Sequence, residues 1–310
     1  MSYLTKRRRG EKIYYYLAEN IQLAKGRRKQ LRKYIGSEKP SENKLQILMA
    51  DFEKEVEKEK QKLHGFHYLT KEEIKEIDEI NKQFWNRFKK ENPTIQEQFE
   101  QNFVNTFVFN TNSIEGSTLT PKEVELLLSE NISPNKPLDD VLEAKAAQKT
   151  LKFIKEYLGD LNQDLLLKIH EIYFNDTKPF IAGKYKTKQN EIRGSRFETT
   201  HPQFVLTDMK IFFQEYNKLK KELHPLELAA WCHWKLVRIH PFQDGNGRTA
   251  RIAMNFVLHK NGYGMLDIKT KEKQAYFKSL EKCNYNNNAR ALAIRLVRRF
   301  KKQYQNALKE

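Results

Sequence analysis

Apolar residues recur three and four positions apart through most of the chain, from about residue 46 to residue 300. This spacing places apolar side chains on one face of an α-helix, and it leaves little room for a large sheet. The periodic segments are 48–63, 71–92, 94–113, 209–223, 226–239, 247–260, 271–283 and 289–300, with shorter stripes at 151–158 and 165–172. We therefore expect a mainly α fold, with helices packed on one another around a common core.

One of these helices has a well-marked start. Thr120 can accept an early N–H bond as a cap, Pro121 suits the first turn, and Glu123 completes a capping box. We therefore expect a helix to begin at about residue 121.

Two stretches interrupt the helical pattern. Residues 183–194 begin at Gly183 and end at Gly194, and the stretch between them is alternating and interrupted by turn residues. This pattern predicts a short β-hairpin. Residues 12–21 are dense in tyrosine and isoleucine, and residues 27–35 mix basic and apolar side chains after a turn at Lys25-Gly26, which predicts a second, basic β-hairpin. A polar linker follows. We therefore divide the chain into a basic N-terminal appendage at 1–45 and a helical domain at 46–310.

The charge of the chain is concentrated at its start. The formal net charge is +17, and about half of this excess lies in the first forty or so residues. A cluster this basic suits a polyanion such as nucleic acid, but a solvated lysine-rich surface explains it equally well. The sequence therefore leaves open both a nucleic-acid contact through the basic N-terminus and assembly into a homo-oligomer.

Several features bear on the cellular compartment. No apolar run approaches the roughly 18–20 residues that a membrane span needs. Residues 1–10 are basic but lack the apolar stretch of a secretory signal. Cys232 and Cys283 show neither metal-type spacing nor a disulfide framework. These features predict a cytoplasmic protein with no membrane partner.

The most informative segment reads HPFQDGNGRTAR and begins at His240. Pro241 disfavours helical geometry at the histidine, so one helix should end there. Gly245, Asn246 and Gly247 follow, and a helical pattern resumes directly after them. A glycine-bracketed loop that opens a helix is an anion site, because its unpaired N–H groups and the helix dipole both favour negative charge.

Four charged or titratable side chains flank this loop. Arg248 and Arg251 lie three positions apart on one helical face, and two guanidinium groups suit a polyphosphate. Asp244 supplies one carboxylate, which suits Mg²⁺ when phosphates and water complete its shell. His240 can accept a proton near neutral pH. Each residue alone has a commoner structural role, but together they predict phosphoryl or nucleotidyl transfer.

The segment resembles the signature HxFx(D/E)GNGRxxR of Fic proteins, which it matches at every defined position. The likeness extends over about residues 110–295 and implies a Fic-type catalytic core at about 138–300. It further implies that His240 deprotonates a target hydroxyl, that Asp244 binds Mg²⁺ and that Phe242 anchors the loop. In that family the loop and the arginines hold the nucleotide phosphates, a role that falls here to Gly245, Asn246, Gly247, Arg248 and Arg251.

Two further segments fit the resemblance. Fic proteins carry a hairpin flap that aligns the target chain by main-chain pairing, and residues 183–194 stand where it is expected. The segment AYFKSLEKCN is similar to the family's helix that borders the nucleotide, which makes Tyr276 and Asn284 candidate adenosine contacts. Phe277 replaces the commoner second tyrosine, so no hydroxyl is expected there.

A third segment, TNSIEG at residues 111–116, resembles the family's (S/T)xxxE(G/N) inhibitory motif. We expect it at the end of an inhibitory helix that spans about residues 94–116. Glu115 is expected to pair with Arg251 and so to occupy the guanidinium that should grip the γ-phosphate. ATP would then bind with its α-phosphate badly aimed at the incoming hydroxyl.

The resemblance therefore predicts a protein adenylyltransferase. It would transfer AMP from ATP to a Ser, Thr or Tyr hydroxyl of an unknown target protein, with Mg²⁺ as cofactor and Glu115 as a brake. One alternative is removal of AMP, or transfer of another phosphate-linked group, on the same scaffold. A second is a nucleic-acid-binding regulator in which the Fic chemistry is secondary.

Overall fold

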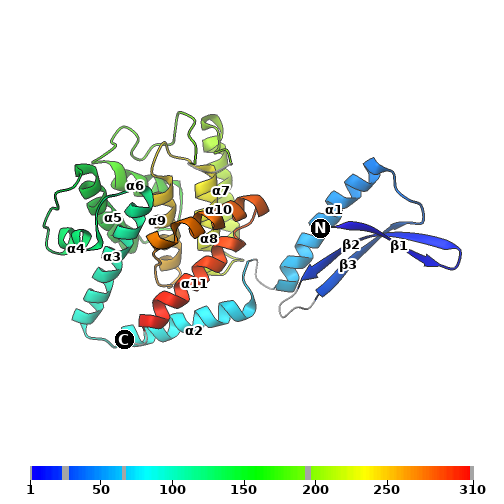
Figure 1. Ribbon diagram of the computed structural model, residues 1–310, viewed down its shortest axis with the longest axis horizontal. Helices are drawn as coiled ribbons and strands as arrows, with labels where there is room; N and C mark the ends of the chain where they lie inside the picture. The colour runs from blue at the N-terminus through cyan, green and yellow to red at the C-terminus, as the bar shows by residue number, and fades with distance from the viewer. Residues whose placement is uncertain (1, 23–27, 65–67, 193–196, 308–310) are drawn as a thin grey trace. The chain divides into compact units, whose positions relative to one another are not determined.

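The computed structural model describes residues 2–22, 28–64, 68–192 and 197–307. The chain divides into two compact units, Met1–Glu72 and Glu73–Glu310 (Figure 1). In the described part of the chain, no helix combines the length and the apolar character that crossing a bilayer requires.

The first unit holds an antiparallel three-stranded sheet in the order β1-β2-β3. Strand β1 spans Tyr3–Arg9, β2 spans Lys12–Gln22 and β3 spans Arg28–Gly36. The β2–β3 pair is the predicted N-terminal hairpin, and its predicted turn lies outside the described residues. Strand β1 was not predicted, because a run of four basic residues hides its alternation.

Helix α1, Glu42–His64, covers one face of this sheet. Leu17 and Ile21 of β2 pack with Phe52 and Val56 of α1, and all four are at most 2% exposed. Apolar burial of this kind stabilises a small unit that has few other contacts. The compact unit therefore extends past α1 to Glu72, whereas the sequence analysis placed the end of the appendage at residue 45.

The second unit consists of helices, and the expectation of a mainly α fold is confirmed. The helices in chain order are α2 Lys71–Phe88, α3 Pro93–Glu115, α4 Pro121–Ser129, α5 Leu138–Glu156, α6 Gln163–Phe174, α7 Val205–Leu219, α8 Pro225–Ile239, α9 Asn246–Lys260, α10 Lys273–Asn286 and α11 Arg290–Ala307. Two short 3₁₀ turns, η2 Pro202–Phe204 and η3 Thr270–Glu272, precede α7 and α10.

Helices α8 and α9 form the centre of this unit (Figure 1). Nearly every side chain of both helices is buried, as expected for helices covered on all sides. Helices α5, α6 and α3 pack against α9, while α7, α10 and α11 pack against α8. The loop between α8 and α9 therefore starts and ends among the most buried helices of this unit.

Two helix ends next to this core follow local rules. Helix α3 ends at Gly116, whose φ of 109° is accessible to glycine at little cost. Helix α4 begins with the predicted capping box, in which Thr120 Oγ1 accepts from the Glu123 N–H and the Glu123 carboxylate accepts from the Thr120 N–H. The capped start of α4 and the sharp stop of α3 give the last turn of α3 a defined position.

Candidate active site

His240 stands where α8 ends and the loop begins. Its N–H donates to the Leu236 carbonyl at 2.9 Å, while its own backbone is left-handed with φ of 56°. Pro241 then prevents the helix from continuing, as predicted. A non-glycine residue with positive φ stores backbone strain, and such strain is concentrated at functional sites. The strain here turns the imidazole out of the helix and toward the loop.

The ring of His240 is suited to accept a proton. Its Nδ1 lies 3.1 Å from the Val237 carbonyl oxygen, and this contact assigns the ring proton to Nδ1. Nε2 is left as the basic atom. Burial lowers the pKa of His240 to about 4, against the opposing effect of the hydrogen bond to Val237. The imidazole is therefore neutral at pH 7.

The loop is closed by its own asparagine. Asn246 Oδ1 accepts from the Phe242 N–H, and Asn246 Nδ2 donates to the Phe242 carbonyl, both at 2.8 Å. Gly245 has φ of 75°, and a Cβ there would lie 2.2 Å from the ring of Phe174. The Asn246 side chain is thus committed to the loop. What a phosphate can meet here is the main chain, because the first N–H groups of a helix lack intrahelical acceptors.

His170 of α6 supports the loop from beneath. Its ring stacks on Phe242, with centroids 3.9 Å apart and planes at 6°. Its Nδ1 accepts from the Gly183 N–H at 3.0 Å, and its Nε2 donates to the Asp244 carbonyl at 3.0 Å. Burial lowers the pKa of His170 to about 4, so this neutral pattern holds at pH 7. One side chain therefore joins α6, the loop and the start of the 183–194 segment.

Arg248 lies in a network of alternating charges. It pairs with Glu143 of α5, and its Nη2 lies 3.7 Å from Asp244 Oδ1. Its guanidinium carbon lies 4.6 Å from the centroid of the Phe174 ring. Lys178 bridges the two carboxylates, at 3.1 Å from Glu143 and 2.7 Å from Asp244. Burial acts to raise the pKa of Asp244, but the hydrogen bond from Lys178 and the charge of Arg248 hold it below its usual value. Asp244 therefore remains a carboxylate.

Arg251 is held by the last turns of α3. Its Nε donates to Thr111 Oγ1 at 2.8 Å, and its Nη2 donates to the Thr111 carbonyl at 3.0 Å and to Glu115 Oε1 at 2.6 Å. The arginine is 1% exposed. Burial acts to raise the pKa of Glu115, but the charge of Arg251 and its hydrogen bond outweigh it, so the pKa is lowered. Both partners are therefore ionised.

The Glu115 carboxylate also covers Gly247. A Cβ at this glycine would lie 2.6 Å from Glu115 Oε1 and 3.2 Å from an Arg251 nitrogen. Gly247 thus allows an anion to approach the main chain at the start of α9. The anion that occupies this place is the protein's own carboxylate.

The two candidate adenosine contacts are packed inside the helical unit. Tyr276 is 1% exposed, and its hydroxyl lies 2.7 Å from His233 Nε2. Asn284 accepts the indole N–H of Trp234 at 2.7 Å. These bonds engage the Tyr276 hydroxyl and the Asn284 side-chain oxygen, and contact of either residue with adenosine stays a prediction. Phe277, next along α10, is 41% exposed.

The 183–194 segment lies against the loop, but its described part, residues 183–192, contains no pair of strands. Tyr185 instead forms an isolated antiparallel bridge with Phe242, and the Lys186 N–H donates to the Pro241 carbonyl at 2.8 Å. Asn190 Nδ2 donates to the Phe242 carbonyl at 2.8 Å. The prediction of a hairpin here needs correction, because the main chain pairs with the loop; residues 193 and 194 lie outside the described part.

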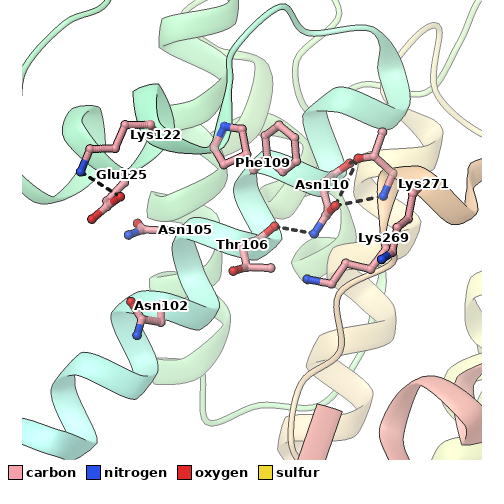
Figure 2. Close-up of a pocket in the computed structure, with 11 residues that line it drawn as sticks. Asn102, Asn105, Thr106, Phe109, Asn110, Lys122, Glu125, Lys269 and Lys271 are labelled. Atoms are coloured by element: carbon pink, nitrogen blue, oxygen red, sulfur yellow. Dashed lines mark hydrogen bonds and ion pairs between the residues drawn. The ribbon is translucent and has the colours of Figure 1, made fainter. Parts of the chain in front are cut away.

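A groove of about 960 Å³ flanks α3, away from these residues (Figure 2). Its lining includes Asn102, Asn105 and Thr106 of α3, Lys122 of α4 and Lys271 of η3. None of the residues that line it belongs to the loop. We do not assign the nucleotide to this groove, because its lining contains none of the residues that form the anion position at the start of α9.

Three residues of the site escaped the sequence analysis: Glu143, His170 and Lys178. Two of them left a signal. Glu143 shares the buried side of α5 with Ala147 and Thr150, and His170 follows Ile169 on the buried side of α6. A charged or titratable residue on an otherwise apolar stripe indicates a buried partner. Lys178 follows α6 in an irregular stretch and shows no such pattern.

The helical core and the glycine loop at its centre can be compared with known proteins. Residues 160–258 match the Fic/DOC family.

The chain is similar in sequence to curated adenylyltransferases. Protein adenylyltransferase Fic of Nematostella vectensis is 29% identical over 58% of this chain and 43% of its own length. Protein adenylyltransferase fic-1 of Caenorhabditis elegans is 29% identical over 57% of this chain and 36% of its own length. The chain thus spans less than half the length of these relatives.

Solved structures show the same fold. A Fic-domain-containing signalling protein from Bacteroides thetaiotaomicron has a TM-score of 0.69 and 28% identity, over 76% of this chain and 96% of its own. Fic-1 of Caenorhabditis elegans, residues 134–508, has a TM-score of 0.67 and 22% identity, over 87% of this chain and 79% of its own.

Proposed function

We propose that this chain is a protein adenylyltransferase that transfers AMP from ATP to a Ser, Thr or Tyr hydroxyl of another protein. The names of its curated relatives support the reaction. The observation that carries the proposal is the position of His240, which is neutral and has a strained backbone. It stands beside the start of a helix whose Arg251 binds a carboxylate, that of Glu115. A base next to a main-chain anion cradle is the arrangement that nucleotidyl transfer needs.

The proposed reaction is an in-line displacement. His240 Nε2 takes the proton of the target hydroxyl, whose oxygen forms a bond to the α-phosphorus of ATP. The bond from this phosphorus to the bridging oxygen breaks, and pyrophosphate leaves. The N–H groups at the start of α9, with Arg251, stabilise the charge that develops on the phosphates.

Asp244 is the residue that we assign to Mg²⁺. Its side chain is 50% exposed at the edge of the loop, and its carboxylate is ionised. Among the residues described, no three His, Cys, Asp or Glu side chains form a closed metal cage. A single carboxylate still fits a magnesium ion that takes its other ligands from phosphates and water. When bound, the ion would neutralise charge on the leaving pyrophosphate.

We infer that Glu115 is a brake on this reaction. Its carboxylate takes the donors of Arg251 and lies over Gly247, where the outer phosphates of ATP belong. A pair of charges about 4 Å apart is worth on the order of 4 kcal/mol at an effective dielectric near 20, before desolvation. Such a pair is strong enough to change how ATP sits in the site.

The test uses ATP labelled on the α- or the γ-phosphate, with self-modification as the readout. We expect Glu115→Gly to raise incorporation of the α label by at least about tenfold, because Arg251 is freed for the phosphates. His240→Ala should abolish incorporation in both backgrounds. Unchanged activity in Glu115→Gly would refute the brake.

The same labels separate the alternatives. Adenylylation retains only the α label, whereas transfer of the terminal phosphate retains the γ label. Removal of AMP would appear as loss of label from a pre-modified protein, with no gain from ATP. A protein that retains neither label after incubation in a lysate would contradict the proposed function.

The proposal also covers the setting of the enzyme. We infer a cytoplasmic enzyme, because ATP is abundant there and Cys232 and Cys283 are free, buried thiols. The target protein is expected to align along residues 183–192, whose main chain borders the loop.

A further inference from the structure

The three-stranded sheet of the first unit has one covered face and one open face. Leu17 and Ile21 of β2 point to the covered face, where they pack against α1. Successive side chains of a strand alternate between the two faces, so Tyr16, Ala18 and Asn20 point to the other side. The described side chains of this open face are Tyr3, Thr5 and Arg7 on β1, Lys12, Tyr14, Tyr16, Ala18 and Asn20 on β2, and Gln30, Arg32 and Tyr34 on β3.

Tyrosines form the centre of the open face. The ring of Tyr34 lies 5.5 Å from that of Tyr16 and 6.1 Å from that of Tyr14, and Tyr34 is 53% exposed. Tyr3 is 40% exposed, and its hydroxyl accepts from Gln30 Nε2 at 2.7 Å, across the small Ala18. The result is a low aromatic platform over all three strands.

Basic side chains lie around this platform on the same face of the sheet. Arg7, Lys12 and Arg32 are exposed, and within the described ranges they have no ion-pair partner. None of the open-face side chains named above is an Asp or a Glu. Two carboxylates of the unit act on the opposite side of the sheet, where Glu19 accepts from the Ser2 hydroxyl and Glu55 of α1 pairs with a lysine of β3.

We propose that this open face, the tyrosine platform, binds single-stranded nucleic acid. Exposed aromatic rings on a sheet stack with unpaired bases, and the surrounding cations contact the phosphates. A duplex hides the flat faces of its bases and would use the cations alone. The platform lies on a different unit from the loop, so the inference does not depend on the proposed transferase activity.

The first test measures binding of the full chain to fluorescent 20-nucleotide strands by anisotropy. The probes are a mixed-sequence single strand, as RNA and as DNA, and the matching DNA duplex. We expect a single strand to bind more tightly than the duplex. Tyr34→Leu and Tyr14→Leu should each weaken it about tenfold, because a lost base stack costs roughly that much. Tyr285→Leu, an equally drastic change at an 85% exposed tyrosine of α10, is the matched control.

The second test measures the salt dependence of the same binding. In the double variant Arg7→Ala, Arg32→Ala, the slope of log K against log salt should fall by about 1.4, because each phosphate contact of a single strand contributes about 0.7. Lys44→Ala, Lys54→Ala on α1 removes the same charge from exposed positions outside the platform.

Four outcomes would overturn the proposal. These are no binding to either single strand, duplex binding as tight as single-strand binding, no effect of the tyrosine variants, and an equal change of slope in the α1 variant. All altered side chains lie outside the Leu17 core, so circular dichroism should show unchanged folding of every variant. If a variant lost both binding and its fold, the binding measurement would be repeated with Tyr34→Phe. This variant keeps the aromatic ring and should bind like the parent protein.

Discussion

Single side chains in this protein are set to their charge states by burial and by one or two partners. His240 and His170 are neutral because burial disfavours the imidazolium, while Glu115 and Asp244 stay ionised because cations outweigh the cost of burial. The site therefore combines a neutral base with ionised acids at the same pH. Acid–base chemistry near pH 7 requires such groups to be held in different protonation states by their surroundings.

The pH dependence of the reaction follows from His240. Because burial lowers its pKa from 6.5 to about 4, we expect kcat/KM of the Glu115→Gly protein to stay level between about pH 8 and about pH 5 and to fall near pH 4. In the unfolded chain His240 is protonated below about pH 6.5, whereas in the folded protein it stays neutral down to about pH 4. The free energy of unfolding therefore also declines as the pH falls from 6.5 toward 4. Rates measured with circular dichroism at each pH separate the two effects. An acid limb near pH 6.5 with the fold intact would show that the base is not buried as described.

At the scale of elements, α3 links the brake to the rest of the helical unit. Asn110 of α3, labelled in Figure 2, accepts from the Thr270 N–H at 2.9 Å. Its Nδ2 also donates to Asp267 Oδ2 at 2.6 Å. Five residues later the same helix presents Glu115 to Arg251. The anchor at Asn110 therefore helps to hold the carboxylate over the loop.

Loss of this anchor should loosen the brake. We expect Asn110→Ala to lower the free energy of unfolding by about 1–3 kcal/mol, because it leaves buried polar groups unpaired. It should also raise α-label incorporation above that of the parent protein. Asn105→Ala is the control on the same helix, since Asn105 bonds within α3 to Gln101 at 2.8 Å and reaches another helix only through a long, exposed contact with Ser129 at 3.4 Å. Equal behaviour of the two variants in the labelled-ATP assay and in hydrogen exchange of α3 would argue against the anchor.

At the scale of the molecule, the chain consists of two units with separate cores. The first core joins the sheet to α1, and the second surrounds α8 and α9. Each core buries its own apolar side chains, so each unit has its own source of stability. A change in one core should leave the other unit folded.

Calorimetry can detect this independence. Leu17→Ala should lower the stability of the first unit by about 2–5 kcal/mol, the usual cost of emptying a buried leucine site. The transition of the second unit should stay in place. The fully buried Leu258→Ala in α9 should have the reverse effect. A single transition that moved with both variants would mean that the units unfold together.

Local patterns in the sequence determined much of the fold. Helical periodicity located the main helices, Pro241 marked the end of α8, and the Thr120 capping box marked the start of α4. These features depend on neighbours within a few residues, which a sequence displays directly. The signature beginning at His240 likewise indicated the Fic family, because its residues are contiguous.

Only the tertiary structure decided which distant side chains meet. Glu143 lies 105 residues before its partner Arg248, and no local rule connects them. Within the described residues 183–192, Tyr185 and the Lys186 N–H pair with the main chain of the loop, and a sequence does not show that these two distant segments meet. The open tyrosine face likewise depended on β1 and α1, since a strand pattern alone does not say which face a helix covers. Contacts between residues far apart in the chain depend on how whole elements pack, and that packing is a property of the complete fold.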